Sequence, residues 1–144
     1  MFYNAENAST YPVDSKYAAL ENPRGLYEAL LCCWDEETCA PRMRKAYKNS
    51  HPTLGQCSIT AFLAQDIFGG DVYGVPLGDG NFHCFNVIDG VAFDLTNEQF
   101  DHPLVYTLDY PQSRENHFAK EEKKQRYLLL KRRLDEYLDK KKHG

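Results

Sequence analysis

The sequence predicts an α+β fold in which helices pack on a small antiparallel sheet. Three observations lead to this class: apolar residues recur at helical spacing in three segments, a turn dipeptide stands between two β-like segments, and the order is helix, helix, strands, helix. The chain has 144 residues, of which 42% are hydrophobic and 26% charged. This is the size range of one compact core, so we expect a single domain over residues 1–144.

The first third of the chain is predicted to hold one helix between irregular segments. Residues 1–20 are polar and weakly patterned, so we expect an extended, partly mobile lead-in. A helix is predicted over Arg24–Trp34, because apolar residues recur there at helical spacing: Leu26, Leu30, Leu31 and Trp34. Residues 35–52 are expected to be irregular chain with a helical turn or two.

Residues 53–70, TLGQCSITAFLAQDIFGG, give the clearest helix prediction. Gly69 and Gly70 provide a left-handed stop, and Cys57 falls in the first turn or so. The apolar stripe consists of Ile59, Phe62, Leu63 and Ile67. The following segment, DVYGVPL, indicates a strand, with a turn at residues 78–80.

A hairpin is predicted around Asp89 and Gly90, which stand between apolar-rich flanks. Both central positions of a tight type I′ turn need a positive φ, and Asp-Gly suits them. With a two-residue loop, Ile88 pairs with Val91, and the numbers of every paired couple sum to 179.

This register places particular side chains on particular faces. His83 then opposes Thr96 and Asp94 opposes Phe85, so His83 and Asp94 project to the same side as diagonal neighbours. Cys84 points to the other side. The remaining polar strand residue, Asn86, is expected on the face of the strand opposite to that of His83, which favours a structural role for Asn86.

The last part of the chain is predicted to be a helical turn, a loop and a long helix. NEQF, residues 97–100, suits a helical turn, and residues 101–116 read as a loop. The helix is expected from about Asn116 to Lys140, with an apolar stripe of Tyr127, Leu130, Leu134, Tyr137 and Leu138. Its charged residues are expected on a solvated face with pairs such as Glu122 and Arg126.

Charge and hydropathy exclude two classes of partner. The net charge is −4, but residues 116–144 hold ten Lys and Arg against five Asp and Glu, so the remainder carries about −9. An acidic body argues against nucleic acid. No basic leader precedes an apolar run, and no window approaches the ~18 apolar residues of a membrane span. We therefore expect a cytoplasmic protein with no membrane partner.

The five cysteines are expected to be thiols, since an odd count in a reducing compartment argues against a disulfide framework. Zinc is an alternative, because Cys32, Cys33 and Cys39 lie close together with His51 beyond them. Adjacent cysteines share one tetrahedral ion poorly. We therefore expect no metal and no cofactor.

Three residues provide the parts of an activated thiol. Thiolate is favoured by the positive end of a helix, by an adjacent imidazole, and by a carboxylate that orients the imidazole. Cys57 supplies the sulfur, His83 the base, and Asp94 the orienting carboxylate. Each residue also has an ordinary explanation: a small buried thiol, a half-buried sheet histidine, and a cap for the turn that follows.

Gln56 has two competing roles. Its amide could help the Cys57 backbone N–H to bind a developing oxyanion. It also stands three residues after Thr53, the spacing of a capping box, and this interpretation is slightly favoured.

Several motifs resemble those of the YunG-like family of small bacterial proteins. PTLGQCSITAFLAQDIFGG, FHCFN and DGVAFDLTNEQF match its GQC-x-x-TA helix, its GSHYWN-like strand and its DLT-x-EQF segment, within a resemblance over about residues 25–134. The resemblance implies a papain-like or transglutaminase-like cysteine-enzyme fold with Cys57, His83 and Asp94 at the catalytic positions. Phe82, Cys84 and Phe85 replace Ser, Tyr and Trp of the pattern, which we expect to reshape a pocket wall.

The expected function is cysteine-dependent acyl transfer through a thioester on Cys57. An amidase or peptidase, a deamidase and an acyltransferase all remain open, with a small molecule or peptide as substrate. The alternative is a non-catalytic binding module on the same fold. A third possibility is an oligomeric or interaction role for the charged terminal helix.

Overall fold

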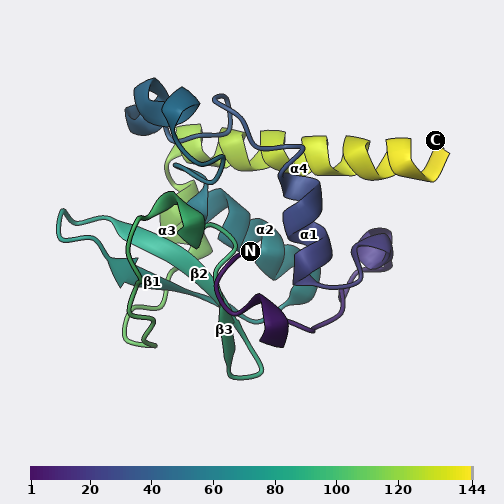
Figure 1. The fold of residues 1–144 in the computed structure, drawn as a ribbon, viewed down its shortest axis with the longest axis horizontal. Helices are drawn as coiled ribbons and strands as arrows, with labels where there is room; N and C mark the ends of the chain where they lie inside the picture. The colour runs from purple at the N-terminus through teal and green to yellow at the C-terminus, as the bar shows by residue number, and fades with distance from the viewer. Residues whose placement is uncertain (144) are drawn as a thin grey trace.

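The computed structural model describes residues 1–143 and has the α+β architecture that the sequence predicts (Figure 1). A three-stranded antiparallel sheet has the order β1-β2-β3. The strands and α-helices are β1 Asp71–Pro76, β2 Phe82–Ile88, β3 Val91–Phe93, α1 Pro23–Leu30, α2 Cys57–Phe68, α3 Arg114–Phe118 and α4 Glu121–His143. Short 3₁₀ helices are η1 Ala5–Asn7, η2 Ser15–Leu20, η3 Pro41–Asn49 and η4 Asn97–Gln99.

The central helix α2 organises the core. Figure 1 shows α2 between the sheet and α1. Helix α4 runs along the top of the view. Gly69 and Gly70 end the helix with φ angles of 84° and 75°, as the sequence predicts. The predicted stripe is fully buried and belongs to the main hydrophobic core: Ile59, Phe62, Leu63 and Ile67.

The hairpin prediction is confirmed over the pairs that form. Asp89 and Gly90 have φ angles of 51° and 79°, and Ile88 pairs with Val91. The ladder ends where β3 ends, so the pairing predicted between residues 83 and 96 does not form. Asp94 instead makes an isolated antiparallel bridge with Tyr3. The N-terminal segment therefore closes the end of the sheet beside Asp94.

The first helix is shorter than predicted. It ends at Leu30, and the backbone N–H groups of Cys33 and Trp34 both donate to the Leu30 carbonyl as the chain turns. Leu31, predicted to be part of the buried stripe, is 42% exposed. The Trp34 indole still reaches the core, because it donates to Thr60 Oγ1 of α2 at 3.0 Å.

The expected lead-in packs on the rest of the chain. It forms η1 and η2, and the Tyr3 backbone N–H donates to Asn97 Oδ1 at 2.8 Å. Its buried side chains are Phe2, Ala5, Ala8, Tyr17 and Leu20.

The C-terminal helix prediction was correct in its stripe and wrong in its continuity. The chain forms α3, capped by Ser113, and then restarts as α4 at Glu121. Arg126 pairs with Glu122 as predicted, but it is buried instead of solvated, because its guanidinium donates to the Thr38 carbonyl at 3.1 Å. The stripe residues Tyr127, Leu130 and Leu134 are buried, with Tyr137 and Leu138 packed against the core. Within residues 1–143, no helix combines the length and apolarity needed to cross a membrane.

Candidate active site

Cys57 is the first residue of α2 and is partly exposed. The loop before it turns at Gly55, which has a φ of 71°. A methyl group at Gly55 would lie 2.6 Å from Cys39 Sγ and 2.9 Å from the Ala40 nitrogen. The Ala40 N–H also donates to the Gly55 carbonyl at 3.0 Å. Only glycine allows this close approach, so Gly55 and its neighbours determine where Cys57 lies.

His83 and Asp94 form a buried pair. The structure brings them together as the hairpin register predicts, with His83 Nε2 2.6 Å from Asp94 Oδ2 and neither residue exposed. Asp94 Oδ2 also accepts the Tyr106 hydroxyl at 2.7 Å, and Oδ1 accepts the Thr96 backbone N–H at 3.0 Å. These partners hold the carboxylate in place, and it fixes the orientation of the imidazole.

The other imidazole nitrogen of His83 is not used by the histidine–aspartate pair. His83 Nδ1 is buried and has no conventional hydrogen-bond partner within residues 1–143. His83 lowers the pKa of Cys57, and Cys57 in turn raises the pKa of His83, as expected for two groups that lie close together. The structure therefore brings the three predicted site residues together.

The surroundings of Cys57 and His83 shift the pKa values of both side chains. A hydrogen bond from the Cys84 thiol and the nearby His83 hold the pKa of Cys57 well below the usual value of a thiol, against the opposing effect of burial. Burial disfavours the charged imidazole, but Asp94 and Cys57 raise the pKa of His83 to about 10. Both shifts favour a thiolate on Cys57 beside an imidazolium on His83.

Cys84 is a part of the site that the sequence analysis missed. It lies on the face of β2 opposite to His83, as the strand alternation predicts, and that face is covered by α2. Its hydrogen bond to the Cys57 sulfur, together with burial, raises the pKa of Cys84 well above its usual range. Cys84 therefore stays protonated and donates to the thiolate. Strand parity gives its face, but only the packing of α2 shows what that face meets.

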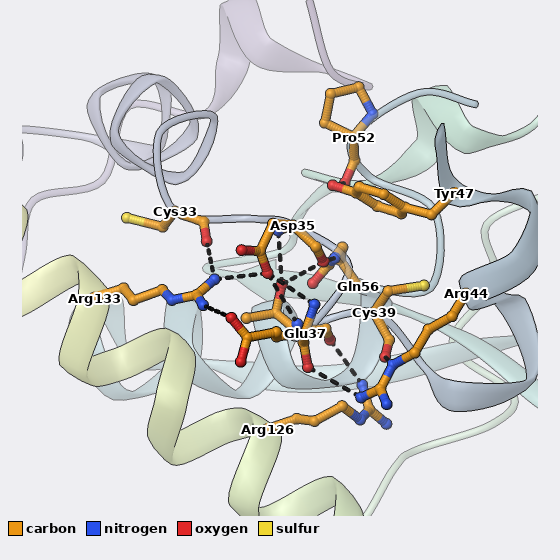
Figure 2. Close-up of polar contacts among 11 residues, drawn as sticks. Cys33, Asp35, Glu37, Cys39, Arg44, Tyr47, Pro52, Gln56, Arg126 and Arg133 are labelled. Atoms are coloured by element: carbon orange, nitrogen blue, oxygen red, sulfur yellow. Dashed lines mark hydrogen bonds and ion pairs between the residues drawn. The ribbon is translucent and has the colours of Figure 1, made fainter. Parts of the chain in front are cut away.

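The Gln56 side chain is directed into the segment after α1. Its Nε2 donates to the Asp35 carbonyl at 3.1 Å, and its side chain is fully buried (Figure 2). The capping-box interpretation is wrong, because Gln56 is itself the N-cap residue and makes no side-chain cap bond. Thr53 Oγ1 instead lies 2.9 Å from His51 Nδ1. The predicted oxyanion role therefore remains a prediction.

A polar cluster anchors this segment to α4 (Figure 2). Arg133 lies 2.7 Å from Asp35 Oδ1 and 2.8 Å from Glu37 Oε1, and it donates to the Cys33 carbonyl at 3.0 Å. Despite partial burial, the contact with Arg133 lowers the pKa of Asp35. The long helix thus holds the chain against which Gln56 is fixed.

Cys57 and His83 both line a cleft of about 900 Å³. Its walls come from η3, the loop before α2, the turn between β1 and β2, and the chain from Gln99 to Arg126. Phe100 lies edge-on to the His83 ring, with centroids 4.9 Å apart. This volume is within the range of small-molecule sites.

The cysteines considered for zinc have other surroundings. Cys39 is buried against Gly55, and burial raises its pKa. Cys33 is buried as well, which raises its pKa to about 11, and Cys32 is exposed. In the part of the chain that the structure describes, no three or more His, Cys, Asp or Glu side chains form a group that could hold a metal ion.

The fold and site define an α+β protein with a partly exposed cysteine at the head of a helix, next to a buried histidine–aspartate pair. The profile of the YunG protein family matches residues 22–139, so the chain belongs to this family. It is 43% identical over 67 residues to "Uncharacterized protein YunG" of Bacillus subtilis (strain 168). That alignment covers 46% of this chain and 56% of the relative, so it spans little more than half of the relative's length. No solved structure matches the chain.

Proposed function

We propose that the protein is a cysteine-dependent acyl-transfer enzyme with a papain-like or transglutaminase-like site. The observation that supports this most is the interaction of a partly exposed thiol with an imidazole whose far nitrogen lies 2.6 Å from a buried carboxylate. Amide or peptide hydrolysis, deamidation and acyl transfer to an amine share the same first half-reaction. The substrate is a small molecule or peptide that fits the cleft.

The first half-reaction forms a thioester. The Cys57 thiolate attacks the acyl carbon, and the carbonyl electron pair moves onto oxygen. As the intermediate collapses, His83 Nδ1 gives its proton to the leaving amine. Asp94 holds Nε2–H throughout and stabilises the imidazolium. The backbone N–H of Cys57, at the head of α2, is the candidate donor to the oxyanion, because the Gln56 amide is buried and donates to the Asp35 carbonyl.

The second half-reaction regenerates the enzyme. Neutral His83 removes a proton from the acceptor, which is water in hydrolysis and an amine in transfer. The acceptor attacks the thioester and expels the Cys57 sulfur as thiolate. The products are an acid or a new amide.

The proposal includes a reducing compartment such as the cytoplasm. Thioester formation needs Cys57 as a free thiol, and all five cysteines are free.

Competitive labelling with iodoacetamide near neutral pH tests the proposal. We expect Cys57 to be alkylated faster than the other four thiols, and we expect His83→Ala to remove the difference. Exposed Cys32 is the internal control, because any advantage of Cys57 over it must come from reactivity and not from access. Uniformly slow labelling would instead support a binding module on the same fold.

A further inference from the structure

One wall of the cleft is cationic. It includes Lys120, just before α4, and Lys123 and Arg126 in its first turns. Arg126 is neutralised by Glu122. Within residues 1–143, neither Lys120 nor Lys123 has a carboxylate partner within 4.0 Å. The other acid in the lining, Asp109, is exposed and makes no ion pair there. The wall therefore carries uncompensated positive charge.

The Lys123 ammonium is held in a fixed place. It is partly buried, and its Nζ lies 2.8 Å from His117 Nδ1. An ammonium can only donate, so Nδ1 accepts and His117 carries its proton on Nε2, which lies 2.8 Å from Gln112 Oε1. Burial and the charge of Lys123 lower the pKa of His117 to about 4, which keeps the ring neutral. Two N–H groups of Lys123 remain available for a ligand.

This chain of side chains lies beside the candidate nucleophile. His117 Nε2 is 4.0 Å from Cys84 Sγ, and the Cys84 thiol is near enough to Cys57 to lower its pKa. The Gln112 amide packs on Gly74, the residue paired with Cys84 in the sheet, where a methyl group would come within 2.8 Å of Gln112 Nε2. The fixed ammonium therefore lines the same cleft as Cys57.

We propose that Lys123, assisted by Lys120, binds a carboxylate of the acyl substrate next to Cys57. The substrate class is then an amide or peptide that carries a free carboxylate close to the reacting carbonyl. A phosphate site usually presents several converging donors or an arginine fork, whereas here one lysine is fixed and a second is exposed. This inference rests on the proposed function, because it names the substrate of the same site.

The test compares two alkylating reagents that differ in charge. Iodoacetate and iodoacetamide attack the same thiolate with the same leaving group, so the ratio of their rates at Cys57 is independent of the thiolate fraction. We expect this ratio to be about fivefold higher at Cys57 than at exposed Cys32, as one nearby cation predicts. The advantage should shrink as salt is added. Peptide mass spectrometry reads both sites in one sample.

Variants assign the effect to Lys123. Lys123→Met should reduce the ratio at Cys57 about fivefold, and Lys123→Arg should retain most of it. Lys124→Met is the matched control, because Lys124 is the exposed neighbour on α4 and is outside the cleft lining. Because an imidazolium at His83 would also attract iodoacetate, only the loss of the advantage on removal of the Lys123 charge assigns the effect, and Lys123→Gln replaces Lys123→Met if that variant does not fold. A salt-independent ratio overturns the inference.

The two proposals fail in different ways. Rapid iodoacetamide labelling of Cys57 without an iodoacetate advantage, or an advantage that survives Lys123→Met, overturns the carboxylate inference and leaves the enzyme proposal standing. Slow iodoacetamide labelling of Cys57 overturns both, since no activated thiol then exists for a substrate to approach.

Discussion

His83 has two nitrogens with different partners, and this difference determines the chemistry of the candidate site. Nε2 is bound to Asp94 at 2.6 Å, while Nδ1 is buried without a hydrogen-bond partner within residues 1–143. A buried sheet histidine with an ordinary structural role would have both nitrogens satisfied by the protein. The ordinary explanation of His83 therefore accounts for only one side of the ring.

At the residue scale, Asp94→Asn should weaken Cys57 as a nucleophile. The amide can occupy the same place, but it removes the charge that raises the pKa of His83 to about 10. The imidazolium is then less stable, so the pKa of Cys57 should rise. We expect the rate of Cys57 alkylation near pH 6 to fall about tenfold or more, since one pKa unit corresponds to a tenfold change in thiolate.

The pH profile of iodoacetamide labelling checks this prediction. A depressed thiol pKa keeps the rate nearly constant as the pH falls toward that pKa, so the Asp94→Asn curve should shift to higher pH. Asp101→Asn is the control, because Asp101 is fully exposed and outside the site. Overlapping profiles for Asp94→Asn and the unmodified protein would contradict this role of Asp94.

At the scale of elements, the junction between the Gly55 loop and α2 positions the sulfur. Helix α2 has a well-packed apolar body, so its first residue can move only if the loop before it moves. The loop is packed against Cys39 and Ala40. The position of the nucleophile thus depends on a close backbone approach that requires glycine.

Gly55→Ala should destabilise the fold and slow the labelling of Cys57. The φ of 71° and the 2.6 Å approach to Cys39 Sγ together predict a loss of about 2–4 kcal/mol in the free energy of unfolding. Urea denaturation measures this loss.

Gly78→Ala is the matched control, since its φ of 84° is similar but no atom lies within 4 Å of the added methyl group. It should cost about 1 kcal/mol. Equal losses in the two variants would show that packing around Gly55 is unimportant.

At the scale of the whole molecule, α4 belongs to the core. Its residues Leu130 and Leu134 are fully buried, and Arg133 ties it to the segment after α1. A surface helix that served only a partner would not bury these side chains. The structure therefore favours a role in stability for this helix.

Deletion of residues 121–144 should unfold the chain. Removing Tyr127, Leu130 and Leu134 from the core costs about 6–15 kcal/mol, which matches or exceeds the stability of a typical domain. Circular dichroism and thermal unfolding measure the outcome. Deletion of residues 139–144 is the control, because residues 139–143 are exposed. A folded product of the longer deletion would remove α4 from the account of the core.

Patterns within single segments of the sequence predicted the elements that depend mainly on interactions between residues close in sequence. The α2 stripe and the hairpin register follow from periodicity and from the Asp89-Gly90 turn, and the contact between His83 and Asp94 follows from that register. The break before α4 was not predicted. Periodicity carries no information about this break, because it lies between Phe118 and Glu121 and the apolar stripe begins only at Tyr127.

Contacts between distant segments account for what the sequence could not show. The burial of Arg126 depends on a carbonyl of the Thr38 segment, and the direction of Gln56 depends on Asp35. The neighbourhood of Cys84 depends on where α2 crosses the sheet. No pattern within one segment carries this information.

The central claim is that Cys57 is a thiolate because His83 is an imidazolium. Ultraviolet thiolate absorbance, recorded as a pH titration and as the difference from Cys57→Ser, measures this most directly. The account predicts a Cys57-dependent absorbance that is already present at about pH 6, below the range in which ordinary thiols ionise, and that disappears at that pH in His83→Ala. A Cys57 absorbance that appears only at the pH of an ordinary thiol, or that is unchanged in His83→Ala, would contradict it.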